Sequence, residues 1–229
     1  MQKLLNSGNY KTRKGEKYGW KTYGLHLAPF NLSGKNVCAD ASIGCSTACL
    51  NTAGRGIMHS VQDARIKKTR GFFEDRTGFL QQLYKEIKSA VKSTAKKELS
   101  SCFRLNLTSD LPWENWVISK FPKQQFYDYT KSLSRFTRFL NGEMPENYHL
   151  TYSRSEETTD ALVIALCKSG GNVAVVFRQH LPETWLGIEV IDGDDSDLRF
   201  QDRTGKIVGL LEKGLAKKDE TGFVVEPTQ

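Results

Sequence analysis

Three closely spaced cysteines are the residues best suited to chemistry in this sequence. Cys38, Cys45 and Cys49 lie in the stretch NVCADASIGCSTACLNTAGRGIMHS, directly ahead of a segment with helical periodicity. Thiolates grouped in this way could hold zinc or an iron–sulfur cluster, could begin a disulfide framework, or could be small core residues. A cubane iron–sulfur cluster held by three protein thiolates leaves one iron open to a substrate or cofactor. A closed zinc site needs a fourth ligand, which His26 or His59 could supply.

The other cysteines and the first residues bear on the oxidation state of these thiols. The chain has five cysteines, an odd number, and Cys102 and Cys167 each flank an apolar segment, as small buried residues do. The start of the chain contains no apolar core of signal-peptide length, and no apolar run approaches the roughly 18 residues of a membrane span. We therefore expect a cytoplasmic protein with no membrane partner, in which thiols stay reduced. A metal or cluster site then competes with the packing of free cysteines.

Two groups of aspartates could act as a nucleophile or as a general acid and base. Asp110 follows an apolar strand in RLNLTSDLPWENW, where the nearby tryptophans would raise its pKa. Asp192 and Asp194 belong to VIDGDDSDLRFQD, whose carboxylates would repel one another unless a ligand or an arginine such as Arg199 compensates them. The structural alternatives are a helix cap at Asp110 and an acidic turn at the other two.

The basic residues favour an acidic partner, nucleic acid foremost. The net charge is +7, and the runs KTRKGEK, RIKKTR and KSTAKKE concentrate positive charge on both sides of the cysteine segment. Solvated helix faces would produce the same runs. Candidate contacts to phosphates and bases, through cationic groups and ring stacking, are Tyr129, Lys131, Tyr152, Arg154, Arg178 and Arg199.

Strands that alternate with helices must position these residues. Residues 21–29 alternate in polarity as a strand does, residues 57–70 and 76–97 show helical periodicity, and CFRLNLTSD predicts a second strand. Four more strands follow in QQFYDYTKS, NYHLTYSRS, GNVAVVFR and LGIEVIDGD. We expect an α/β fold, a compact partial (β/α) barrel of about six mostly parallel strands, with residues 1–20 as a polar basic arm and residues 21–229 as one domain. Most candidate residues then stand at the carboxyl ends of strands, where parallel sheets build their sites.

Several blocks of the sequence resemble a bacteriophage family called gene product eighty-eight. The blocks are YGLHLAP, VCADASIGCSTACLNTAGRG, RLNLTSDLPWE, FYDYTKS, YHLTYSRSE and VIDGDDSDLRFQDRTGKIVGLLEKG, in that order, and they cover nearly the whole chain beyond the arm. The resemblance implies a phage or prophage source, and the family has no well-defined activity. The order of strand, cysteine loop and helix also resembles radical S-adenosylmethionine enzymes, although the cysteine spacing differs. The expected barrel also resembles the guanine transglycosylases, which use two aspartates and a structural zinc. Asp110 and the pair Asp192 and Asp194 would take the part of the aspartates, although the zinc motif here stands at the opposite end of the chain.

We expect an enzyme that acts on nucleic acid, DNA rather than RNA, or on nucleotides. The leading hypothesis is a transferase that modifies or exchanges bases in phage DNA, with Asp110, Asp192 and Asp194 as the catalytic candidates. One alternative is a redox enzyme with an iron–sulfur cluster at the three cysteines. The other is a non-catalytic nucleic-acid-binding protein whose cysteines are structural.

Overall fold

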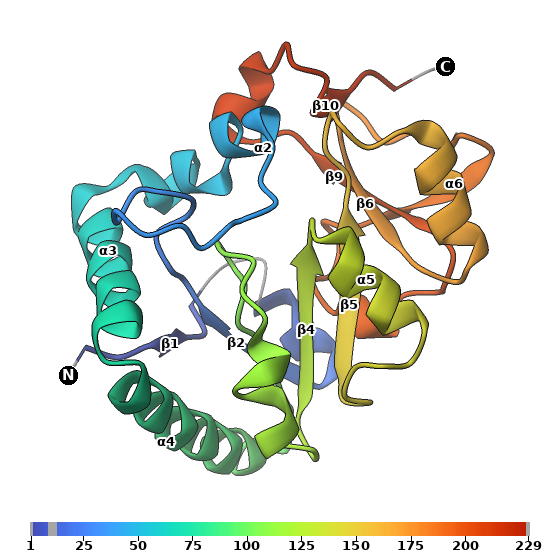
Figure 1. Cartoon of the computed structure of the whole chain (residues 1–229). Coiled ribbons are helices and arrows are strands. Elements are labelled where there is room, and N and C mark those ends of the chain that lie inside the picture. Colours follow the sequence, from blue (N-terminus) through green and yellow to red (C-terminus); the bar gives the residue numbers. More distant parts are fainter. Residues whose placement is uncertain (1, 9–12, 228–229) are drawn as a thin grey trace.

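Ten strands form one sheet in the computed structural model, which describes residues 2–8 and 13–227 (Figure 1). In chain order they are β1 (Leu5–Asn6), β2 (Trp20–Leu25), β3 (Ser100–Arg104), β4 (Gln125–Thr130), β5 (Tyr148–Ser153), β6 (Val173–Phe177), β7 (Thr184–Trp185), β8 (Ile188–Asp192), β9 (Ile207–Leu211) and β10 (Val224–Val225). Their order across the sheet is β1-β2-β3-β4-β5-β6-β9-β8-β7. β10 pairs with the end of β6 that extends beyond its pairing with β5.

The sheet is parallel except where β1 and β7 pair at its two edges. The strands from β2 to β6, then β9 and β8, pair in parallel, as the alternation of strands and helices predicts. The predicted number of about six strands is too low. Because the sheet ends in β1 and β7 without closing on itself, the predicted six-stranded partial barrel is not confirmed. The carboxyl ends of the parallel strands nevertheless meet along one edge, which we call the rim.

Helices α3 to α6 cover one face of the sheet (Figure 1). The helices are α2 (Ile43–Thr47), α3 (His59–Glu74), α4 (Arg76–Ala95), α5 (Leu133–Leu140) and α6 (Asp160–Lys168). Short 3₁₀ helices are η1 (Lys14–Tyr18), η2 (Leu50–Thr52), η3 (Gly54–Ile57), η4 (Trp113–Asn115), η5 (Ile118–Lys120), η6 (Arg199–Gln201) and η7 (Gly214–Lys218). In α4, Phe79, Leu83 and Ile87 recur every fourth residue and are buried against the sheet. The Asp75 carboxylate caps this helix by accepting a hydrogen bond from Gly78 N at 2.9 Å.

The face of the sheet opposite these helices, which we call the inner face, is covered by the chain itself. Successive strand residues point to opposite faces, so Phe103 enters the helix-covered core while Cys102 and Tyr127 point away from it. Residues 193–203, called the crossing segment below, run over the inner face, and Leu198 packs there against Cys102 and Tyr127. The acidic stretch is therefore folded across the sheet.

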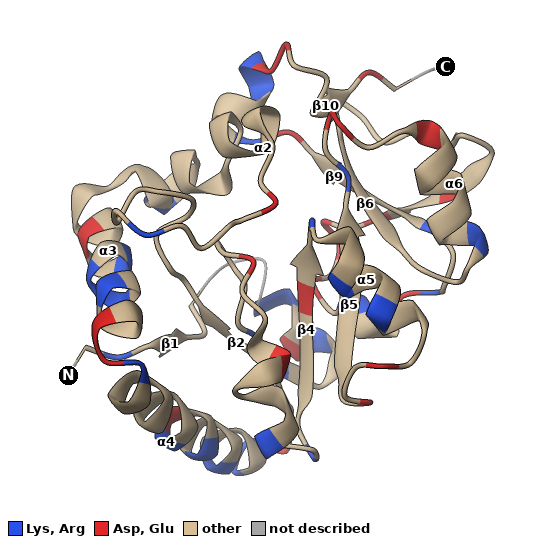
Figure 2. Cartoon of the chain, in the orientation of Figure 1, with Lys and Arg blue, Asp and Glu red and all other residues tan. Residues whose placement is uncertain are grey.

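The amino-terminal residues, predicted as a polar arm, contribute β1 and η1. The Glu86 carboxylate of α4 accepts hydrogen bonds from the backbone N–H groups of Leu4 and Leu5 at 2.8–3.0 Å, which holds β1 beside β2. Residues 9–12 lie outside the described residues. Figure 2 shows Lys and Arg on α3, α4 and α5, with acidic residues among them on α3 and α4. In the part of the chain that the structure describes, no helix is long and apolar enough to cross a membrane.

Candidate functional site at the rim

The three cysteines lie on a loop that is attached to the rim. After β2 ends at Leu25, residues 26–58 form this cysteine loop before α3 begins. The backbone N–H of Asp110, in the connection from β3 to β4, donates to the Val37 carbonyl at 2.8 Å. One residue further along the loop, the Cys38 Sγ lies 4.0 Å from the Thr108 carbonyl. The first cysteine is therefore held against the end of the neighbouring strand.

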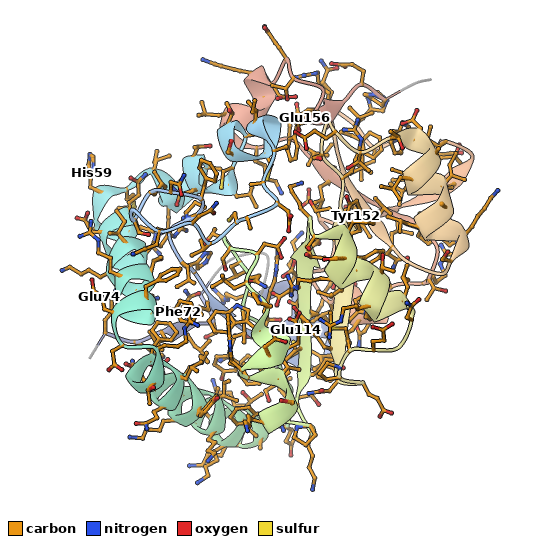
Figure 3. All side chains as sticks on the ribbon, viewed as in Figure 1. His59, Phe72, Glu74, Glu114, Tyr152 and Glu156 are labelled. Atoms are coloured by element: carbon orange, nitrogen blue, oxygen red, sulfur yellow. The ribbon has the colours of Figure 1, made fainter. Side chains whose placement is uncertain are left out.

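Glu156, which follows β5, anchors the middle of the cysteine loop (Figure 3). Its carboxylate accepts hydrogen bonds from Ser42 Oγ and Gly44 N, both at 2.7 Å. Ser42 caps α2 by accepting from the Cys45 N–H at 3.1 Å. Position 44 has no room for a side chain, because an added Cβ would lie 2.3 Å from Thr221 Oγ1. These contacts fix the position of Cys45 relative to β5.

Cys38 is a free, partly buried thiol beside a strained residue. Burial raises its pKa to about 12, and a hydrogen bond from the backbone N–H of Phe30, 3.5 Å from the sulfur, opposes the rise. Phe30 has a φ of 48°, in the left-handed region that bulky residues rarely adopt. Strain of this kind persists only where the surrounding structure enforces it. At Phe30 the strained backbone directs its N–H group at the Cys38 sulfur.

Burial also raises the pKa values of Cys45 and Cys49, and each has a cation that opposes the rise. The ammonium of Lys131 lowers the pKa of Cys45, and the guanidinium of Arg65, on α3, lowers that of Cys49. Cys45 and Cys49 each raise the pKa of Cys38, so the three sulfurs lie within electrostatic range of one another. Each thiol therefore has its own cation or N–H donor that favours the thiolate.

Lys131 fixes its positive charge where β4 and β5 end. Its ammonium donates to the carbonyl and hydroxyl of Ser153, both at 3.1 Å, and to the Arg154 carbonyl at 3.0 Å. Its backbone N–H donates to Asp110 Oδ2 at 2.8 Å. Burial lowers the pKa of Lys131, while Cys45 and Asp110 raise it. Because all three ammonium hydrogens are engaged, this cation is held in place beside the cysteine loop.

Comparison with known proteins identifies the family. The chain matches the family described as Gene product 88 over residues 3–227, nearly its whole length. The chain belongs to the gene product 88 family. This is the bacteriophage family that the sequence blocks indicate. No curated protein and no solved structure matches the chain, and the weaker resemblances to radical S-adenosylmethionine enzymes and guanine transglycosylases are not confirmed.

In the gene product 88 chain, Asp110 belongs to an ion-pair network beneath α5. Arg135 Nη1 lies 2.5 Å from Asp110 Oδ1, while its Nε and Nη2 each lie 2.9 Å from a Glu114 oxygen. Thr130 Oγ1 and Lys131 N donate to the other Asp110 oxygen at 3.1 and 2.8 Å. Burial raises the pKa of Asp110, and the Arg135 charge lowers it. Both carboxylate oxygens are engaged, so this side chain holds the β3–β4 connection against α5 (Figure 3, at Glu114).

Asp192 and Asp194 stand where the crossing segment begins and have partners of their own. Asp192 Oδ1 accepts from Asp194 N at 2.7 Å, which shapes the turn after β8. The Asp194 carboxylate lies 2.7 Å from the ammonium of Lys213, after β9, and its backbone carbonyl accepts from Lys14 of η1 at 2.5 Å. The acidic stretch thus connects η1, ahead of β2, with the distant strands β8 and β9.

The other five predicted contact residues fall into three groups. Arg154 and Arg178 follow β5 and β6 and donate to backbone carbonyls near the carboxyl end of the chain at 2.7–3.3 Å. Tyr152 is buried in the core against an aromatic ring of α5. Tyr129 and Arg199 lie on the inner face, Tyr129 beneath a guanidinium and Arg199 in the crossing segment. Of these five residues, Arg154 lies beside Lys131, whose ammonium donates to the Arg154 carbonyl.

The reasoning from sequence missed the residues that surround these candidates. Arg65 and Glu156 lie in the stretches RIKKTR and YHLTYSRSE, and Arg135 lies in none, but no role was predicted for any of the three. Each acquires its role from a segment far away in the chain. One available signal was Arg135, the arginine that opens the stretch RFTRFL, because a buried arginine needs partners. Because that signal names no partner, the network could not have been assembled from it.

The cysteines are the residues here that could hold a metal. Three thiols on one loop suit a thiophilic metal, and their charge would be compensated by Lys131 and Arg65. Among the described residues, no three His, Cys, Asp or Glu side chains already stand in an arrangement that would hold a metal ion. The donor chemistry therefore fits a thiolate-held centre, whereas the side chains are not preorganised as its ligands.

Proposed function

We propose that this gene product 88 protein is a redox enzyme whose metal centre is held by Cys38, Cys45 and Cys49. The observation that carries the proposal is the position of three free thiols on one loop at the carboxyl edge of a parallel sheet. Parallel α/β sheets build their active sites at this edge, from loops that follow the strands.

The ligand set favours an iron–sulfur cluster over a structural zinc. A closed zinc site needs four ligands. Of the two histidines considered for this role, His59 is exposed at the start of α3, and His26 lies 3.4 Å from the Thr108 hydroxyl. Three thiolates are sufficient for a cubane with one open iron, and such a cluster, when bound, supplies one-electron transfer.

The chain's own residues supply positive charge and a hydrogen-bond donor for this centre. Lys131 and Arg65 place two cations beside Cys45 and Cys49, which lowers the cost of holding several thiolates together. The Phe30 N–H donates to Cys38, and such hydrogen bonds to ligating sulfurs tune a cluster's reduction potential. Nucleic acid or a nucleotide remains our proposed substrate class, on the strength of the net charge of +7.

Base exchange through aspartates receives less support from the geometry. Its nucleophile and acid would have to reach a substrate, but Asp110 holds Arg135 and Asp194 holds Lys213. Residues used in this way stabilise the fold, so we propose structural roles for both carboxylates.

The test is the metal content of protein purified without oxygen. We expect iron and acid-labile sulfide together with broad visible absorption in the wild-type chain, and the loss of all three in the Cys38→Ser/Cys45→Ser/Cys49→Ser variant. The control is the Cys102→Ala/Cys167→Ala variant, which changes the two cysteines buried elsewhere and should keep the iron. Zinc without colour, no metal, or iron that survives in the triple variant would overturn the proposal.

A further inference from the structure

The inner face of the sheet contains buried polar atoms without hydrogen-bond partners. In the described part of the chain these include Arg104 Nε, Tyr129 Oη, Thr151 Oγ1 and Arg199 Nε, all inaccessible to solvent. Thr151 and Arg199 are 0% and 1% exposed as whole residues. An unsatisfied buried polar group costs about 1–3 kcal/mol, so native proteins keep few of them. Several such atoms on one face need an explanation.

These four residues, called the inner-face cluster, adjoin one another. Tyr129 and Thr151 are direct partners across the β4–β5 pair, so their side chains leave the same face side by side. The Arg104 guanidinium lies 4.5 Å from the centre of the Tyr129 ring. Arg199 belongs to η6, which packs on β4 and β5. The unpartnered atoms therefore come from three neighbouring strands and the segment that crosses them.

The ion pairs of the cluster use other atoms than the four named above. Arg104 Nη1 lies 3.0 Å from Asp197 Oδ1, and Arg199 Nη1 lies 3.2 Å from Asp202 Oδ2. These carboxylates balance the two guanidinium charges, and the Nε–H edges remain available as directional donors. The hydroxyls of Tyr129 and Thr151 can donate as well. The cluster thus offers up to four donors to a group that has several acceptor oxygens.

We propose that the inner-face cluster binds the oxyanion of a small substrate, a carboxylate or a phosphate. Guanidinium and hydroxyl donors that meet an oxyanion form charge-assisted hydrogen bonds, which are stronger than those to a neutral acceptor. Binding would satisfy the four donors together. This site is independent of the proposed metal centre, because none of its residues is a cysteine and its occupation can be measured without metal.

Thermal unfolding of the full chain with inorganic phosphate or acetate, against chloride at equal ionic strength, tests this site. One of the two anions should raise the melting temperature of the wild-type chain, and which one does so distinguishes phosphate from carboxylate. Tyr129→Phe and Thr151→Val should weaken this protection about ten- to a hundredfold in anion affinity. Without anion, both variants should melt at the wild-type temperature or above it, because each removes only an unpartnered hydroxyl.

Tyr18→Phe is the matched control, since the Tyr18 hydroxyl bonds Asp195 at the exposed end of η1. It should leave anion protection unchanged. Failure of both anions to protect the wild-type chain, or equal protection of all variants, would overturn the proposal. Early melting of Tyr129→Phe and Thr151→Val without anion would overturn it too, because it would assign the hydroxyls to bound water.

Discussion

Replacing Arg135 by Met should destabilise the fold far more than replacing Arg138 by Met. Both arginines lie on α5, and methionine keeps an unbranched apolar side chain while removing the guanidinium. Arg135 holds Asp110 and Glu114, whose side chains are 11% and 3% exposed. The Arg135→Met variant leaves two buried carboxylates without their cation. Removing one partner of a buried ion pair costs roughly 3–5 kcal/mol.

Arg138→Met is the matched control on the same helix. Arg138 lies 3.8 Å from Glu143, and both side chains are about half exposed (47% and 53%). Exposed ion pairs contribute about 0.2–1 kcal/mol. Urea unfolding followed by circular dichroism gives both free energies. If Arg135→Met loses less than about 1 kcal/mol, or no more than Arg138→Met, the network of Arg135, Asp110 and Glu114 does not hold the rim.

Three further predictions follow from other parts of the chain. Burial raises the pKa of Asp128 to about 7, against about 3.9 in an unfolded chain. The folded state therefore binds this proton more tightly, and the contribution of Asp128 to stability falls as the pH rises from about 4 to about 7. Asp128→Asn should remove this fall in the free energy of unfolding, measured by urea titration at several pH values. An unchanged pH dependence in the variant would contradict the raised pKa of Asp128. Gly44→Ala should lower both the melting temperature and the metal content, because the added Cβ meets the residues that position α2. Gly71→Ala, in open space on α3, should instead stabilise the fold by about 0.5–1 kcal/mol. Equal changes in melting temperature for the two variants would contradict the tight packing at Gly44. If basic side chains bind phosphates, the affinity for DNA in fluorescence anisotropy should fall log-linearly with salt, and binding that is undetectable at low salt would remove nucleic acid as a partner.

The long helices and the parallel strands could be predicted because their signals are local. Apolar residues at helical spacing predict helices at 57–70 and 76–97, and the structure has α3 at His59–Glu74 and α4 at Arg76–Ala95. Alternation of strands and helices predicts parallel pairing, which is observed from β2 to β6 and on through β9 to β8. β9 was missed because IVGLL is a continuous apolar run, and β1 because a two-residue strand in a polar segment depends on β2 beside it.

The candidate site was predicted in position more than in detail. The sequence places the cysteines on a loop after the first parallel strand and the charged residues at strand ends, because both follow from local order. The partners of Asp110 could not be predicted, since Arg135 lies 25 residues away and meets it only after β3 and β4 pair. The crossing segment was missed for a related reason. An acidic run has the composition of an exposed turn, and its burial depends on Arg104, a residue of the opposite half of the chain.

The most direct test of the central claim is the reactivity of each cysteine in anaerobically purified, folded protein. Alkylation with iodoacetamide, followed residue by residue in a mass spectrometer, should leave Cys38, Cys45 and Cys49 unmodified together until a chelator removes the metal, after which all three react. The two buried cysteines, Cys102 and Cys167, provide an internal reference that should react slowly in both conditions. If the three thiols react at the same rates with and without the chelator, or if only one of them is protected, they do not jointly hold a metal.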